Sequence, residues 1–225
     1  MASTARVQDR LRQRALLITT LTVPLTGWTV HAVSLHRQLA AARRDPLTGL
    51  LGRDGYTIKA QQVLRRYGDS ALVVLVDVDH FKQINDTRGH AAGDRVLADI
   101  ARRLTAWAGS HASVGRLGGD EFAVATRIGP GRRQLRLAQL TTLLAQPVEV
   151  DDGAPIDVAA SIGAASPDIL GTTALSLLQR AADAAMYEGK HSERAILAGP
   201  QHAAVPSING RRAGRPGTDS LGRAA

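Results

Sequence analysis

The spacing of hydrophobic positions changes several times between residues 45 and 194, and each spacing predicts an element. Residues 53–67 carry apolar side chains among polar ones and predict a helix that ends at Gly68. Residues 71–76 are apolar without alternation, which is typical of a strand covered on both faces. Residues 91–107 have apolar positions at helical spacing with arginines between them, and predict an amphipathic helix.

The second half of this region alternates short apolar runs with helical ones. Two short segments, 111–117 and 122–126, are separated by Gly118-Gly119-Asp120-Glu121, which predicts a hairpin. Two further helices and a strand are expected at 132–145, 172–187 and 156–164. The resulting order, αβααββαβα, favours an α+β fold with helices packed against one largely antiparallel sheet.

The two flanks differ from this region. Residues 15–36 contain no Asp, Glu, Lys or Arg, and as a helix they would extend about 33 Å, enough to cross a bilayer. Pro24 and Gly27 interrupt that run, so membrane association through it is expected without a choice between spanning and lying on the surface. We therefore expect an apolar, basic N-terminal helical segment over residues 1–44, acting as a membrane anchor or a dimerising helix. Residues 195–225, rich in Gly, Pro and Arg, are expected to form a disordered tail.

Charge follows the same division. The net charge is +8, yet residues 1–44 hold seven Arg and one Asp, and residues 195–225 hold four Arg and one Asp. The 17 basic and 18 acidic side chains between them nearly cancel. With two Trp, three Tyr and two Phe, the chain is poorly supplied for stacking on nucleic acid, which we do not expect as a partner. The absence of cysteine excludes disulfides and cysteine-ligated zinc.

Carboxylates gather where the predicted central strand ends. Asp77 and Asp79 have the i, i+2 spacing that places both side chains on one side of an extended chain, where they can hold a divalent cation. Taken alone, the pair is more typical of a solvated strand end, and Asp94 of a charge at a helix N-terminus. Gly118 and Gly119 permit close approach of a ligand to the backbone, or serve the turn alone.

The motifs carry more information together than singly. DVDHFKQIND at 77–86, GHAAGD at 89–94 and RLGGDEF at 116–122 occur in this order, and together they resemble the catalytic domain of diguanylate cyclases, the GGDEF family. DPLTGL at 45–50 looks like the entry motif of that domain. Two later segments are also similar to it: ASIG at 160–163, and ADAAMY at 182–187 followed by Lys190. The resemblance covers residues 45–194.

The resemblance implies a fold and a reaction. The fold would be that of purine-nucleotide cyclases and polymerase palms, a ferredoxin-like sheet surrounded by helices. The reaction would condense two GTP into cyclic di-GMP and two pyrophosphates, in a homodimer with two Mg²⁺ or Mn²⁺ ions per site. Because GTP is the substrate, the catalytic domain would lie in the bacterial cytoplasm, associated with the inner face of the plasma membrane. The alternative is a catalytically inactive GTP-binding regulatory module of the same fold.

Individual roles follow from the same resemblance. It implies catalytic residues at the hairpin, metal ligands there and at the strand end, two residues that read guanine, and cations and an aromatic ring that hold the triphosphate. The catalytic residues would be Gly118, Gly119, Asp120 and Glu121, and the metal ligands would be Asp77, the Val78 carbonyl, Asp120 and Glu121. Asn85 and Asp94 would read guanine. The triphosphate would be held by Phe81, Lys82, Lys190 and Arg194.

Some positions depart from the family pattern or fall outside it. Many members carry an R-x-x-D product-binding site shortly before the hairpin, and the equivalent stretch here is Gly109-Ser110-His111-Ala112, so no feedback inhibition through that site is expected. The last-helix motif also differs at three positions, although both of its cations, Lys190 and Arg194, are present. Two further groups are expected to be solvated, without a binding role: the histidines His80, His90 and His111, and the arginines Arg132, Arg133 and Arg136.

Overall fold

The computed structural model describes Trp28, His31 and residues 44–150, 153–190 and 194–203. The described residues from Arg44 onward belong to one compact unit. The predicted N-terminal helical segment, with its membrane association through 15–36, lies almost wholly outside the described residues. Within the described part of the chain, no helix has the length and apolar character needed to cross a membrane.

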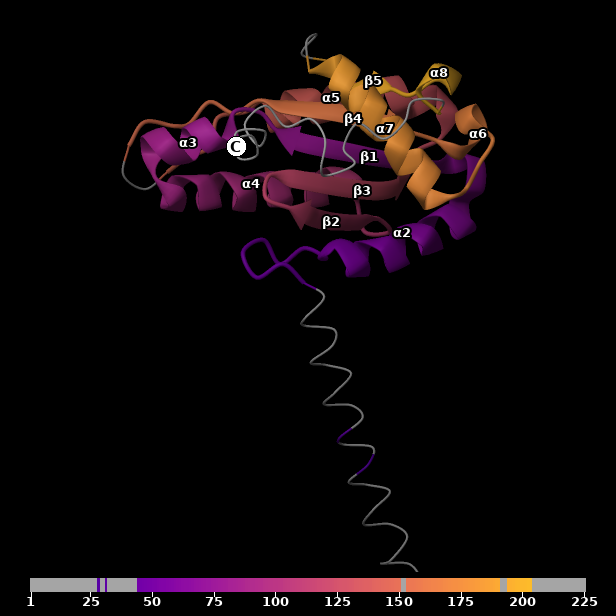
Figure 1. The fold of residues 1–225 in the computed structure, drawn as a ribbon, viewed down its shortest axis with the longest axis horizontal. Helices are drawn as coiled ribbons and strands as arrows, with labels where there is room; N and C mark the ends of the chain where they lie inside the picture. Colours follow the sequence, from indigo (N-terminus) through magenta and orange to yellow (C-terminus); the bar gives the residue numbers. More distant parts are fainter. Residues whose placement is uncertain (1–27, 29–30, 32–43, 151–152, 191–193, 204–225) are drawn as a thin grey trace, which may run out of the picture. The chain divides into compact units, whose positions relative to one another are not determined.

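The centre of the unit is a five-stranded sheet (Figure 1). Its order is β2-β3-β1-β4-β5, and every neighbouring pair is antiparallel except β4 and β5. The strands are β1 (Ala71–Val78), β2 (Ser113–Gly118), β3 (Glu121–Arg127), β4 (Ala160–Ala165) and β5 (Ile196–Leu197). The order β2-β3-β1-β4 is that of a ferredoxin-like sheet, so the fold predicted for residues 45–194 is confirmed.

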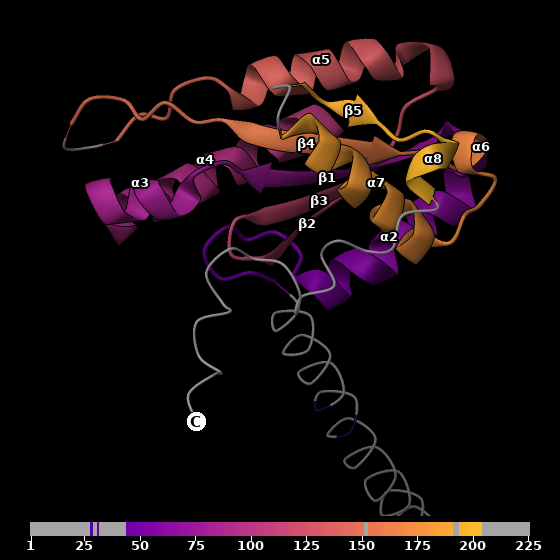
Figure 2. The same ribbon diagram turned by 45° about the horizontal axis from the view of Figure 1, so that its top comes forward.

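Helices cover both faces of the sheet (Figures 1 and 2). The helices are α2 (Arg53–Tyr67), α3 (Phe81–Arg88), α4 (His90–Ala108), α5 (Arg133–Leu144), α6 (Pro167–Leu170), α7 (Leu175–Gly189) and α8 (Pro200–Ala203). Apolar side chains of α4 and α5 pack on one face, and those of α2 and α7 pack on the other. Alternate residues of β1 enter the two cores, Val74 with α4 and Val73 with α2, which explains its unbroken apolar run.

Two boundaries differ from those that the sequence predicts. The strand expected at 156–164 begins only at Ala160, and Ile156 instead pairs with Val148 in an isolated bridge. Part of the tail expected to be disordered is folded, because β5 and α8 lie within it. The Ala198 amide donates to the Ala164 carbonyl at 2.7 Å, and His202 accepts a hydrogen bond from the Gly199 amide through Nδ1. These contacts extend the sheet beyond Arg194.

A glycine in β4 lets α7 approach the sheet closely. A Cβ on Gly163 would lie 2.0 Å from the Ala182 carbonyl oxygen and 2.5 Å from the Met186 amide nitrogen. Both atoms are helix backbone, which cannot move aside without shifting α7. Gly163 therefore sets the depth at which α7 packs, and with it the position of Lys190 immediately after the helix.

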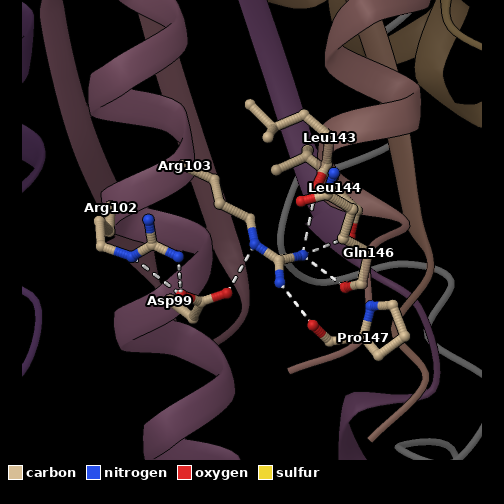
Figure 3. Close-up of polar contacts among 7 residues, drawn as sticks. All are labelled: Asp99, Arg102, Arg103, Leu143, Leu144, Gln146 and Pro147. Atoms are coloured by element: carbon tan, nitrogen blue, oxygen red, sulfur yellow. Dashed lines mark hydrogen bonds and ion pairs between the residues drawn. The ribbon is translucent and has the colours of Figure 1, made fainter. Parts of the chain in front are cut away.

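The segment after α5 is held by one buried arginine. Arg103, on α4, is 5% exposed and donates from Nη1 to the carbonyls of Leu143, Leu144 and Gln146, and from Nη2 to that of Pro147, as Figure 3 shows. Its Nε lies 2.6 Å from a carboxylate oxygen of Asp99. A cation at the C-terminus of α5 satisfies carbonyls that the helix leaves unpaired. The contact fixes the start of the connection that leads to β4.

The arginines near α5 correct another expectation. Arg133 is 2% exposed and is not solvated; it donates to Asp168 at 2.8 Å and to the Asp69 carbonyl at 2.5 Å. Arg136 lies over the ring of Trp107, 5.0 Å from its centroid, and donates to the Trp107 carbonyl. Their partners lie 29 to 64 residues away, and helical spacing alone does not reveal them. These two arginines therefore have structural roles.

Candidate active site

The end of β1 brings together polar side chains of three strands, with acidic ones from β1 and β3. Asp77 is opposite Glu121 of β3 on one side and Ser161 of β4 on the other. The Ser161 hydroxyl donates to Asp79 Oδ1 at 2.7 Å. The β1 backbone also contacts the hairpin, because the Val78 amide donates to the Asp120 carbonyl at 3.2 Å. Carboxylates that are far apart in the sequence thus meet at one edge of the sheet.

Lys190 extends to this edge from the end of α7. Its Nζ donates to Asp77 Oδ2 at 2.6 Å, and the Asp77 side chain is 15% exposed. Burial by itself would lower the pKa of Lys190, but the hydrogen bond to Asp77 and the negative charges of Asp77, Asp79 and Asp120 outweigh burial and raise that pKa. The ammonium is therefore firmly charged, in a field produced by three carboxylates.

Two arginines, Arg116 of β2 and Arg53 of α2, hold the β2–β3 hairpin in place. Arg116 donates from Nε to the Gly119 carbonyl at 2.8 Å and from Nη1 to both carboxylate oxygens of Asp45 at 3.1 Å. Arg53 donates to the Leu117 carbonyl at 2.7 Å. The turn itself needs glycine, because Gly119 has a φ of +50°. The hairpin is thus tied to the segment that precedes α2.

Asp45 is a strong anchor for this contact. The Thr48 amide and hydroxyl donate to its Oδ1 at 2.8 and 2.7 Å, in addition to Arg116. Burial raises the pKa of Asp45, but the hydrogen bonds from Thr48 and the guanidinium of Arg116 outweigh burial and hold the pKa below its ordinary value. The carboxylate therefore stays ionised at neutral pH.

The residues expected to read guanine lie on α3 and α4. Asn85 is half-buried on α3, and a Cβ built on Gly93 of α4 would lie 2.0 Å from its Oδ1. Asp94 follows Gly93 and is exposed in a cavity of about 460 Å³, whose walls include Leu47 of the entry loop and Val150 and Ile156 beyond α5. Asn85 and Asp94 thus lie on neighbouring helices, and Asp94 lines the cavity.

The remaining predicted residues are more dispersed. Phe81 begins α3 and is half-buried against the core beneath α4, whereas Lys82 is exposed. Glu121 lines a second cavity, of about 280 Å³, between the sheet and α7, to which Arg53 also contributes. Arg194 is exposed just before β5. His80, His90 and His111 are all exposed, as expected.

The oxygen donors at the strand end suit a hard divalent cation. In the part of the chain that the structure describes, no three His, Cys, Asp or Glu residues are grouped tightly enough to hold a metal ion by themselves. Mg²⁺ typically binds through one or two carboxylates and completes its shell with water and substrate phosphates, so a three-acid cage is not required. The Lys190 ammonium against Asp77 marks a position that already favours positive charge. Asp77, Asp120 and the Val78 carbonyl fit such an ion.

Four residues that help to build the candidate site were not assigned a role from the sequence: Arg53, Arg116, Asp45 and Gly93. Asp45 lies within the motif DPLTGL and Arg116 within RLGGDEF, but neither motif indicates that the two residues pair. Their contact spans 71 residues, and the contact of Arg53 with Leu117 spans 64. No local pattern reveals contacts at such separation.

Comparisons with known proteins agree with this geometry. Residues 42–195 match the family described as diguanylate cyclase, GGDEF domain. An uncharacterized 19.3 kDa protein of Streptomyces ambofaciens is 48% identical over 172 residues, which are 76% of this chain and 91% of that protein. The diguanylate cyclase TpbB of Pseudomonas aeruginosa is 35% identical over 176 residues, 76% of this chain and 40% of TpbB.

A solved structure shows the same fold. The GGDEF domain of TpbB superposes with a TM-score of 0.62 at 34% identity, covering 71% of this chain and 96% of that domain. Since the family match spans more than half of the sequence, the chain belongs to the GGDEF-domain family of diguanylate cyclases. The match covers less than half the length of TpbB itself.

Proposed function

We propose that this chain condenses two molecules of GTP into cyclic di-GMP with release of two pyrophosphates. One observation carries the proposal: Asp77, the hairpin acids Asp120 and Glu121, and the cation Lys190 converge on one edge of the sheet. Family membership supports the same conclusion. Such a cluster suits phosphoryl transfer, which depends on positioning and on neutralising negative charge.

The substrate would be held by groups on both sides of that edge. Asn85 and Asp94 would contact the guanine, because a carboxylate accepts from the ring N–H and the amino group of guanine, and an amide can donate to O6. Phe81, Lys82, Lys190 and Arg194 would hold the triphosphate. Gly118 and Gly119 would let the α-phosphate approach the hairpin backbone, because neither carries a side chain.

Asp77, the Val78 carbonyl, Asp120 and Glu121 would hold two Mg²⁺ or Mn²⁺ ions, whose chemistry when bound is to polarise phosphate oxygens and shield the leaving pyrophosphate. The hydrogen bonds from Arg116 and Arg53 would keep the hairpin carboxylates in place during the reaction. Lys190 would move from Asp77 to the triphosphate when the nucleotide binds.

Each bond formed joins atoms of two nucleotides. The 3′-hydroxyl of one GTP loses its proton to Glu121 or to water and attacks the α-phosphorus of the other, the bond from that phosphorus to the bridging oxygen breaks, and pyrophosphate leaves with the electron pair. The same step repeated in the opposite direction closes the ring. Because each domain would hold one GTP, two copies of the chain must meet face to face, and we propose a homodimer as the active form.

The test is incubation of the purified chain with GTP and Mg²⁺ or Mn²⁺, followed by chromatographic identification of the products. Cyclic di-GMP is expected from the wild type, and ATP in place of GTP is expected to give no cyclic dinucleotide. Glu121→Ala is expected to abolish turnover and to leave the melting temperature within a few degrees of wild type, since Glu121 lies next to a surface turn. Binding of GTP without any turnover by the wild type would instead indicate the regulatory module.

A further inference from the structure

Gly93 occupies a position of α4 where the backbone meets the Asn85 side chain of α3. An ideal Cβ at Gly93 would lie 2.0 Å from Asn85 Oδ1, 3.0 Å from its Cγ and 3.2 Å from Cζ of Phe81. Real Cβ atoms essentially never approach another heavy atom to less than 3.0 Å. The Asn85 amide therefore occupies the volume that any side chain at position 93 would need.

No backbone requirement explains this glycine. Gly93 lies in the first turn of a 19-residue helix, and it is absent from the residues of positive φ, such as Gly89 and Gly109, that flank that helix. Glycine inside a helix is less stable than alanine by about 0.5–1 kcal/mol. The glycine thus carries an energetic disadvantage that neither its conformation nor its helix accounts for.

We propose that Gly93 is a positioning residue for guanine selectivity, whose missing side chain seats the Asn85 amide beside Asp94. This inference rests on the proposed function, because it assumes that Asn85 and Asp94 face the base. Asp94 is the next residue along α4 and is exposed in the 460 Å³ cavity. The position against which Asn85 packs, Gly93, therefore directly precedes Asp94, the residue with which Asn85 would bind guanine. Gly93 acts only through Asn85 and contacts no substrate atom.

The nature of the contact separates selectivity from folding. The nearest atom to a Cβ at position 93 is the far end of a side chain on an eight-residue helix that buries none of its residues fully. The amide can rotate away, and the Phe81 ring needs to yield by only a few tenths of an ångström. Gly93→Ala should therefore displace the amide while the fold, and the higher helix propensity of alanine, preserve stability.

The experiment measures the affinity of the full chain for GTP, ITP and ATP, with thermal melting as a parallel readout. For Gly93→Ala we expect unchanged or higher melting temperature and about tenfold weaker binding of both GTP and ITP, the loss that corresponds to one or two hydrogen bonds. ITP keeps O6 and lacks only the amino group facing Asp94, so the two losses should match. Discrimination against ATP should fall by the same factor.

Two controls make the result specific. Gly131→Ala places a methyl where no atom lies within 4 Å and should leave all three affinities unchanged. In an Asn85→Ala background, Gly93→Ala should weaken GTP binding no further, because the displaced group is already absent; this double variant also relieves the collision if the single variant is unstable.

The outcomes separate the inference from the function on which it rests. Wild-type affinity for GTP in Gly93→Ala, or an additional loss in the Asn85→Ala background, overturns the positioning role alone. Failure of the wild type to bind GTP overturns the proposed function together with the inference. GTP binding without turnover leaves the positioning role intact and removes only the catalytic part of the proposal.

Discussion

Replacing Lys190 by Met should make the nucleotide-free chain bind a divalent cation more tightly. The Lys190 ammonium lies 2.6 Å from Asp77 Oδ2, which is a proposed metal ligand, so a metal ion must displace it. Methionine keeps much of the length of the side chain and removes the charge. The ion pair would then no longer compete with the metal for the same carboxylate.

The magnitude follows from the exposure of the pair. The Lys190 side chain is 39% exposed and that of Asp77 is 15% exposed. Pairs that remain accessible to solvent contribute about 0.2–1 kcal/mol, because water and salt screen them. Losing up to about 1 kcal/mol of competition should strengthen binding of the cation by up to about fivefold.

The assay is a titration of the nucleotide-free full chain with Mn²⁺, in which electron paramagnetic resonance reports the free ion. Lys59→Met is the matched control, since Lys59 is exposed on α2 and its replacement changes the net charge equally. The same Lys190 variant should bind GTP more weakly, because the lysine would contact the triphosphate once the nucleotide is bound. Unchanged or weaker Mn²⁺ binding by Lys190→Met would refute competition for Asp77.

Three further predictions concern stability and regulation. Tyr56→Phe should raise the free energy of unfolding by about 1 kcal/mol in urea titrations, because the Tyr56 hydroxyl is buried with no partner among the described residues. Asp168→Asn should lower it by about 2 kcal/mol at pH 7, since Arg133 would lose its charged partner. Burial raises the pKa of Asp168, but hydrogen bonds from Arg133 and Ser166 outweigh burial and hold the pKa below its ordinary value. The contribution of Asp168 is therefore present above the unfolded-state pKa and lost as the pH falls through the lowered folded-state pKa, so wild type and variant should converge in urea titrations at still lower pH. Cyclic di-GMP should not inhibit turnover by binding at residues 109–112. Tight, inhibitory binding of cyclic di-GMP at that turn would contradict this prediction.

The sequence predicted best those parts of the fold that local pattern determines. The unbroken apolar run of β1 and the Gly-Gly turn before Asp120 each carry their signal within a few residues. The family motifs mark Asp77 and the hairpin acids, and the sheet register places Asp77 opposite Glu121.

What escaped prediction depends on contacts between distant segments. Arg133 was expected to be solvated, but it is buried and donates a hydrogen bond to Asp168, which lies 35 residues further along the chain. Arg116 and Asp45 pair across 71 residues, and the importance of Gly93 comes from the Asn85 side chain of α3 that lies against it. A charge or a glycine in the sequence does not say which distant atom it will meet.

The central claim is that this chain joins two GTP molecules, and the stoichiometry of the products tests it most directly. The full chain, incubated with GTP and Mg²⁺, should release two pyrophosphates for each cyclic di-GMP. The rate per chain should rise with protein concentration until all chains are dimeric. Absence of cyclic di-GMP at concentrations where the chain is folded, dimeric and bound to GTP would contradict the account.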